Sequence, residues 1–160
     1  MKSNLLLKLS EIKLFLFDLE GVLLPKDSAK TLESEDQFLL QLSKACEELL
    51  QYDVKLGIVT ASNDSLIDKI KTNSKCILLS DSINKVKMVD EFLKHDTIDY
   101  SQVFYIGDDI LDIPLLQKCG ISGVPKDGRR EVKRVVSFIT KAGSGEVLPE
   151  IIEYIKQIKK

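Results

Sequence analysis

Six short apolar runs alternate along the chain with segments in which apolar residues recur every three or four positions. The runs occupy residues 13–18, 55–60, 75–80, 102–107, 120–124 and 135–139. Runs of this length are typical of strands that are buried on both faces, and the intervening segments have the periodicity of amphipathic helices. The pattern therefore predicts an α/β fold, in which helices cover both faces of a parallel sheet.

The longest helical segment is predicted over residues 34–53. Ser34 and Gln37 have the spacing of a capping box, which places the start of the helix at Ser34. An apolar stripe continues at helical spacing through Phe38, Leu42, Ala45 and Leu49. These features indicate a helix of about four turns with one buried face.

Shorter helices are predicted over residues 63–71, 85–95 and 114–119. Gly120 follows the third of them, in the position that usually ends a helix. A final helix is predicted to begin near Pro149, because proline suits a first helical turn.

Residues 23–33 have no clear pattern, which predicts a loop or a weak hairpin. Asp18 and Glu20 stand just before this segment. It is therefore a candidate lid or substrate wall.

The composition of the 160 residues fits one domain spanning 1–160, because 44% of them are hydrophobic and 30% are charged. The net charge is −2 and no segment interleaves basic with aromatic residues, so a nucleic-acid partner is not expected. Lys8, Glu11 and Lys13 interrupt the apolar N-terminal segment, which predicts a cytoplasmic protein with no membrane partner. Three cysteines without metal-ligand spacing are expected to be reduced, buried thiols: Cys46, Cys76 and Cys119.

Polar residues collect where the predicted strands end. They are Asp18 and Glu20 after the first run, Thr60 and Ser62 after the second, and Asp108, Asp109 and Asp112 after the fourth, while Lys85 opens a helix. Loops and helix N-termini converge at the carboxyl ends of parallel strands, so we expect these side chains to share one crevice. Taken singly, each is more often a cap, a turn residue or a surface lysine. Their joint order favours a site.

Carboxylates brought that close repel one another unless they bind protons or share a cation. Magnesium is the natural candidate, because it prefers oxygen ligands and bridges to phosphate. A carboxylate nucleophile, a magnesium ion, a lysine and a hydroxyl together suit phosphoryl transfer.

Four stretches resemble the motifs of the haloacid dehalogenase-like phosphohydrolases, which have a three-layer Rossmann-like fold. They are "FDLEGVLL", "GIVTAS", the helix opening at Lys85, and "YIGDDILD". The last stretch and the closing "ITKAGSGEVLPEIIEYI" resemble the cap-less phosphatases of octulosonate 8-phosphate and acylneuraminate 9-phosphate. The distance from Lys85 to the glycine of "GDD" matches those relatives, which favours Lys85 over Lys87 as the phosphate-binding lysine.

The resemblance implies a role for each residue of the predicted site. Asp18 would be the nucleophile that forms an aspartyl-phosphate, and Glu20 the general acid and base. Thr60 and Lys85 would hold the phosphoryl oxygens. The metal would be held by Asp18, Asp108 and the backbone carbonyl of Glu20, with Asp109, Asp112 and Ser62 in support. Cap-less relatives use a neighbouring subunit to wall the site, so a homo-oligomer, possibly a tetramer, is expected.

The chain departs from these relatives at several positions. Glu20 stands where the family usually has aspartate. The enolase-phosphatases of the same superfamily also have glutamate at this position. Arginines that could clamp a sugar carboxylate are missing, and Ser144 stands where one of them is expected. Lys126 and Lys141 are the candidates to replace them, although a solvated helical face is the commoner reading of the basic cluster at 125–134.

These observations predict a magnesium-dependent phosphomonoesterase that hydrolyses a small phosphorylated sugar or sugar acid. An alternative is a catalytically weak domain that serves as an assembly module in sugar-nucleotide synthesis, which Glu20 and the missing arginines favour. A two-component receiver domain also gathers aspartates and a lysine at strand ends. In a receiver domain the acceptor aspartate follows a middle strand, after an acidic pair at the first strand. Here the candidate nucleophile Asp18 follows the first strand and the acidic pair follows a later one, which argues against a receiver domain.

Overall fold

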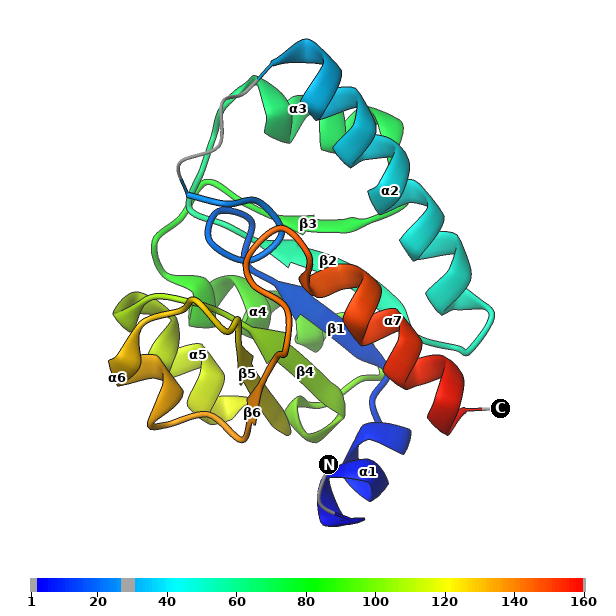
Figure 1. Cartoon of the computed structure of the whole chain (residues 1–160), viewed down its shortest axis with the longest axis vertical. Coiled ribbons are helices and arrows are strands. Elements are labelled where there is room, and N and C mark those ends of the chain that lie inside the picture. The colour runs from blue at the N-terminus through cyan, green and yellow to red at the C-terminus, as the bar shows by residue number, and fades with distance from the viewer. Residues whose placement is uncertain (1–2, 27–30, 160) are drawn as a thin grey trace.

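One six-stranded parallel sheet organises the computed structural model, which describes residues 3–26 and 31–159 (Figure 1). The strands are β1 Leu14–Phe17, β2 Lys55–Val59, β3 Ile77–Leu79, β4 Val103–Ile106, β5 Ile121–Val124 and β6 Phe138–Ile139. They lie in the order β3-β2-β1-β4-β5-β6, and every neighbouring pair is parallel. Each strand lies within one predicted run, so the predicted α/β fold is confirmed.

Helices cover both faces of this sheet. They are α1 Ser3–Ser10, α2 Leu32–Leu50, α3 Ser65–Asn73, α4 Lys85–Lys94, α5 Ile113–Lys118, α6 Arg130–Lys133 and α7 Val147–Ile158, with short 3-10 turns η1 Tyr100–Gln102 and η2 Ile110–Asp112. Residues of α1, α2, α3 and α7 pack with Phe15 and Phe17, whereas residues of α4, α5 and α6 pack with Leu14 and Leu16. The chain reverses direction across the sheet after β3, and right-handed crossovers then put α4, α5 and α6 on the opposite face.

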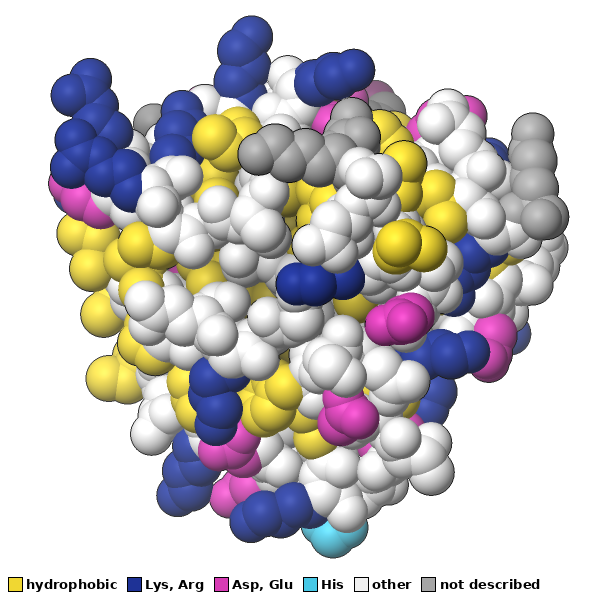
Figure 2. Space-filling view, turned by 90° about the horizontal axis from the view of Figure 1, so that it is seen from below, with side chains coloured by type: hydrophobic (Ala, Val, Ile, Leu, Met, Phe, Trp, Pro, Cys, Tyr) yellow, Lys and Arg dark blue, Asp and Glu magenta, His cyan; other side chains and the backbone are white. Residues whose placement is uncertain are grey.

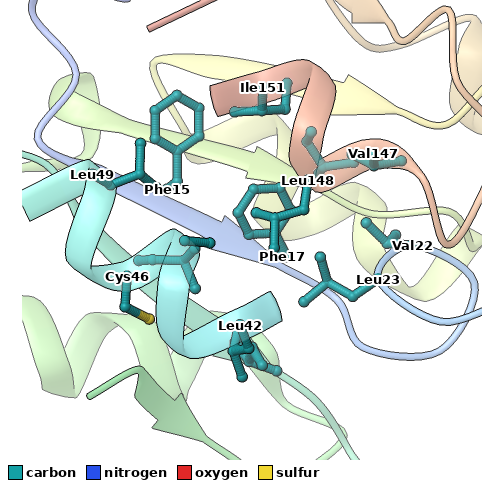
Figure 3. Close-up of a cluster of buried hydrophobic side chains, with 14 of the residues drawn as sticks. Phe15, Phe17, Val22, Leu23, Leu42, Cys46, Leu49, Val147, Leu148 and Ile151 are labelled. Atoms are coloured by element: carbon teal, nitrogen blue, oxygen red, sulfur yellow. The ribbon is translucent and has the colours of Figure 1, made fainter. Parts of the chain in front are cut away.

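The core between α2, α7 and β1 is made of closely packed apolar side chains. Figure 3 shows Phe15 and Phe17 of β1 between Leu42, Cys46 and Leu49 of α2 and the residues of α7. The predicted stripe of α2 is buried along its length, as Phe38, Leu42, Ala45 and Leu49 all belong to this cluster. Burial of each such side chain stabilises the fold by about 1.5–3 kcal/mol.

The predicted start of the long helix is wrong. The N-cap of α2 is Thr31, whose hydroxyl accepts a hydrogen bond from the Ser34 N–H at 3.1 Å, while the Thr31 N–H donates to the Ser34 hydroxyl at 3.1 Å. Ser34 is therefore the third residue of the helix, and Thr31 is the N-cap of the capping box. The usual capping box has a glutamate or glutamine three residues after its Ser or Thr, and here Ser34 takes that place. The usual pattern therefore matched Ser34 and Gln37 and predicted an N-cap three residues too late.

Other differences lie at the ends of the chain. Helix α7 begins at Val147, two residues before Pro149, and the sequence pattern did not predict α1.

Gly120 follows α5 as predicted, and a Cβ there would lie 2.1 Å from the Ser101 carbonyl oxygen. No helix in the described part of the chain is long and apolar enough to cross a membrane.

The three cysteines are free thiols, as predicted. Cys46 is buried, while Cys76 and Cys119 are partly buried.

On the face seen in Figure 2, basic and acidic side chains are interspersed, so neither sign of charge dominates there.

Candidate active site

The carboxyl ends of β1, β2 and β4 and the first turn of α4 surround one cavity of about 180 Å³. Its lining contains eight of the predicted site residues: Asp18, Glu20, Thr60, Ser62, Lys85, Asp108, Asp109 and Asp112. Four further residues line it that were not predicted: Lys26, Ala61, Ile83 and Leu111. The topology that puts β1 between β2 and β4 explains why segments so distant in sequence meet here.

Asp18 follows β1 directly, and its backbone continues the sheet. Its N–H donates to the Ile106 carbonyl at 3.0 Å, and its carboxylate accepts the Leu19 N–H at 2.8 Å. The residue is only 8% exposed. Burial, followed by the negative charge of Asp112, raises the pKa of Asp18 to about 8, although Lys85 opposes the shift. Without a further cation, this site holds more negative charge than it can stabilise.

A divalent cation fits this arrangement. Asp18, Asp108 and Asp112 each offer an oxygen, and the three oxygens lie within 4.8 Å of one another. Burial also raises the pKa of Asp108, while Lys26 opposes the shift. Carboxylate oxygens are the ligands that magnesium prefers, and its charge would stabilise the ionised form of these buried carboxylates.

Asp112 is the best-satisfied carboxylate of the three. One oxygen accepts hydrogen bonds from the Tyr105 hydroxyl at 2.8 Å and the Lys85 ammonium at 2.6 Å. The other accepts the N–H groups of Asp108 at 3.0 Å and Asp109 at 3.1 Å. Burial would raise the pKa of Asp112, but Lys85 and these hydrogen bonds hold it below its usual value. With four donors already bound, Asp112 orders its neighbours, so Asp18 and Asp108 would be the main ligands of a metal and Asp112 would support them.

Lys85 is fixed between two carboxylates. Its ammonium group lies 3.1 Å from Asp18 and 2.6 Å from Asp112, and the side chain is 10% exposed. Burial opposes its charge, yet these carboxylates raise the pKa of Lys85 above its usual value. Lys87 is exposed, and its N–H donates to the Asn84 side chain at 3.1 Å in the cap of α4. The structure therefore brings Lys85 into the cavity and leaves Lys87 outside its lining.

Thr60 and Glu20 line the same cavity as Asp18. The buried Thr60 hydroxyl accepts the Ser62 N–H at 3.1 Å, which orients it in the turn after β2. Glu20 is exposed in a tight turn, where Gly21 donates its N–H to the Leu24 carbonyl at 2.6 Å. Gly21 has φ +84°, and a Cβ there would lie 2.1 Å from the Asp108 carboxylate. Only glycine allows this turn to pass so close to Asp108.

Two residues that contact the carboxylates of the site, Lys26 and Tyr105, were not among the predicted site residues. The Lys26 ammonium lies 3.0 Å from Asp108 and 3.6 Å from Asp109, so the loop after β1 does contribute to the cavity wall. Residues 27–30 of the predicted 23–33 loop lie outside the described residues. Tyr105 lies inside an apolar run and is fully buried, and its contact with Asp112 spans seven positions. No local pattern separates such a tyrosine from an ordinary core residue.

The candidate replacements for the missing arginines lie outside the cavity lining. Lys126 is exposed, and its N–H donates to the Ala142 carbonyl at 3.2 Å. Lys141 lines a separate depression beside α1 and β6. Ser144 donates from both its N–H and its hydroxyl to Asp127 at 2.7 Å, which ties the closing loop to the turn after β5. The arginine nearest the described site is Arg129, 3.6 Å from Asp109.

Comparisons with known proteins agree with this geometry. A family model described as haloacid dehalogenase-like hydrolase matches residues 26–152, a span that contains Thr60, Lys85 and Asp108 and begins after Asp18. The 3-deoxy-D-manno-octulosonate 8-phosphate phosphatase KdsC of Escherichia coli is 22% identical over 152 residues, which cover 89% of this chain and 78% of that protein. N-acylneuraminate cytidylyltransferase A of Danio rerio is 29% identical over 98 residues, which cover 60% of this chain and only 23% of that protein.

The fold is also shared with solved structures. One is the crystal structure of 3-deoxy-D-manno-octulosonate 8-phosphate phosphatase from Moraxella catarrhalis in complex with a magnesium ion, a phosphate ion and a KDO molecule. It has a TM-score of 0.83 and 21% identity, and the match covers 99% of this chain and 94% of that chain. At this identity the likeness establishes the shared fold.

Proposed function

Because the chain belongs to the haloacid dehalogenase-like hydrolases, we propose that it is a magnesium-dependent phosphomonoesterase acting on a small phosphorylated sugar or sugar acid. The observation that carries the proposal is the meeting of the buried Asp18 and Asp108 with Lys85 in one cavity. The relative KdsC, a phosphatase of 3-deoxy-D-manno-octulosonate 8-phosphate, supports the substrate class.

In the proposed reaction, a carboxylate oxygen of Asp18 attacks phosphorus and the bond from phosphorus to the sugar oxygen breaks. Glu20 gives its proton to the departing oxygen. Glu20 then removes a proton from water, whose oxygen attacks the aspartyl-phosphate and releases phosphate and Asp18. Lys85 and Thr60 hold the phosphoryl oxygens throughout.

Asp18, Asp108 and the backbone carbonyl of Glu20 would hold Mg²⁺, with Asp109 and Asp112 in support. When bound, the ion neutralises phosphoryl oxygens and the negative charge around Asp18. Lys85 orients Asp18 and favours its ionised form, since its ammonium lies 3.1 Å from that carboxylate. Burial of Asp18 excludes competing water from the nucleophile.

Phosphate release tests the proposed function. We expect the protein to hydrolyse an aryl phosphate and at least one member of a panel of phosphorylated sugars and sugar acids, in Mg²⁺ and not in EDTA. A colorimetric assay for free phosphate measures this. Absence of release from every substrate would contradict the proposal.

Replacing Glu20 with glutamine separates proton transfer from metal binding. The amide cannot exchange a proton with the leaving oxygen, so we expect kcat to fall by about 10²-fold or more. Because only the backbone of residue 20 is proposed to contact the metal, the Kd for Mg²⁺ should change less than about twofold. Steady-state kinetics and calorimetric Mg²⁺ titration measure the two quantities. A large loss of Mg²⁺ affinity would show that the Glu20 side chain is itself a ligand.

The comparisons do not favour the assembly-module alternative, although one relative, matched over 23% of its length, is a cytidylyltransferase. The complete set of cavity residues around Asp18 argues against it, because a module kept only for assembly has no need of them. The predicted homo-oligomer stays a prediction, which light scattering of the purified protein tests.

A further inference from the structure

Lys26 is a cation that the turn after β1 places against the proposed metal ligands. Its ammonium group lies 3.0 Å from one oxygen of Asp108 and 3.6 Å from one oxygen of Asp109. The hydrogen bond to Asp108 raises the pKa of Lys26, so it stays charged. Lys26 thus neutralises the outer side of the acidic cluster.

A divalent ion and Lys26 compete for the same carboxylate. An ion bound to Asp108 would repel an ammonium group only 3.0 Å from that side chain. Lys26 is 49% exposed and its four-carbon stem is flexible, so the ammonium group can leave Asp108 without unpacking the core. Metal binding therefore releases a positive charge at the mouth of the cavity.

The other charged groups of the described site are already committed. Lys85 is held by Asp18 at 3.1 Å and Asp112 at 2.6 Å. Arg129 lies outside the cavity lining and pairs with Asp109 at 3.6 Å and Glu131 at 3.8 Å. The mouth also carries two exposed apolar side chains, Ile83 and Leu111, at 81% and 73% exposure. Among the described lining residues, Lys26 is therefore the cation best placed to meet a ligand group beyond the phosphate.

We propose that Lys26 is a specificity-determining residue that pairs with Asp108 and Asp109 in the absence of metal and, once Mg²⁺ binds, holds a second anionic group of the substrate. The substrate class is then a phosphomonoester that also carries a carboxylate. The pairing of Lys26 with a substrate anion rests on the proposed function. The competition between Lys26 and the metal ion concerns metal binding alone.

Metal titration tests the first half without any turnover. In Lys26→Met the competing charge is gone, so the Kd for Mn²⁺ should fall by about fivefold or more relative to the wild type. Lys26→Arg retains the charge and should stay within about twofold. Lys44→Met makes the same substitution at an exposed position of α2 outside this cavity and should also stay within about twofold. Equal Kd values for Lys26→Met and Lys44→Met would overturn the proposal.

Competition between matched ligands tests the second half. The probes are 6-phosphogluconate and sorbitol 6-phosphate, which are identical except that the first has a carboxylate where the second has an alcohol. Each is tested as a competitive inhibitor of aryl-phosphate hydrolysis in Mg²⁺. Wild type should bind the carboxylate-bearing probe about tenfold more tightly, the scale of one charge-assisted hydrogen bond. Lys26→Met should reduce this preference to within about twofold, and Lys26→Arg should retain it.

The outcomes separate this inference from the proposed function. A wild type that does not prefer 6-phosphogluconate, or a preference that survives in Lys26→Met, overturns the role of Lys26. If the wild type hydrolyses no phosphoester at all, the proposed function fails, and the Mn²⁺ titration still decides whether Lys26 competes with the metal.

Discussion

Asp18→Asn is expected to abolish phosphate release, lowering kcat by at least about 10⁴-fold, the scale of losing a covalent nucleophile. The amide is nearly the same size as the carboxylate and leaves the buried turn after β1 in place. Phosphate release measured at saturating Mg²⁺ and aryl phosphate gives the loss. Residual turnover within a factor of ten of wild type would show that another group attacks phosphorus.

The same substitution is expected to stabilise the metal-free protein. The pKa of Asp18 is about 8 in the fold against an ordinary value of 3.8, so between these values the folded protein holds a proton that the unfolded chain releases. Wild-type stability in EDTA should therefore fall as the pH rises from about 4 to about 8 and then level off. Asp18→Asn lacks this titration and should be more stable than wild type above pH 8, by about 1–3 kcal/mol.

Urea unfolding in EDTA at several pH values measures this difference. The lost ion pair of Asp18 with Lys85, at 3.1 Å, offsets part of the gain. The two proteins should approach the same stability only below about pH 3.8, where Asp18 is protonated in both the folded and the unfolded wild type. A variant that is less stable than wild type at pH 9 would show that the ion pair outweighs the cost of the buried charge.

Sequence alone was enough to predict the sheet and most of the cavity, because both depend on local patterns. The six apolar runs mark strands buried on both faces, and Asp18, Thr60 and Asp108 each follow one of them. The carboxyl ends of parallel strands share one edge, so the position of each residue in its own element placed it in the site.

The remaining parts of the site depend on contacts that leave no local pattern. Lys26 stands in a poorly patterned segment, and only the tight turn at Gly21 brings it back over Asp108. Tyr105 occupies a buried strand position, where an aromatic side chain is ordinary, and its role follows from the Asp112 carboxylate above it. Lys141 was a candidate because it stands in the closing loop, where the relatives have an arginine, but it lines another depression.

Asp112→Ala is expected to be the most destabilising single change in the site. Asp112 accepts four hydrogen bonds, from Tyr105, Lys85 and the N–H groups of Asp108 and Asp109. Alanine leaves these donors buried without their acceptor, which costs about 3–5 kcal/mol for a broken buried ion pair. In a chain of this size, that corresponds to a fall in Tm of roughly 6–20 °C. Thermal unfolding in EDTA measures it, so metal binding does not contribute.

Tyr105→Phe is the matched control, because it removes one of the four donors and keeps the ring and the carboxylate. Asp112 retains Lys85 at 2.6 Å and both N–H groups, so the cost should be about 1 kcal/mol. Asp112→Asn is a second control, since it keeps an acceptor oxygen for the Asp108–Asp109 turn while it removes the charge that pairs with Lys85. Its loss of stability should lie between the other two. If Asp112→Ala proved as stable as Tyr105→Phe, the turn that presents Asp108 would not depend on Asp112, and its four hydrogen bonds would have to be replaced by water.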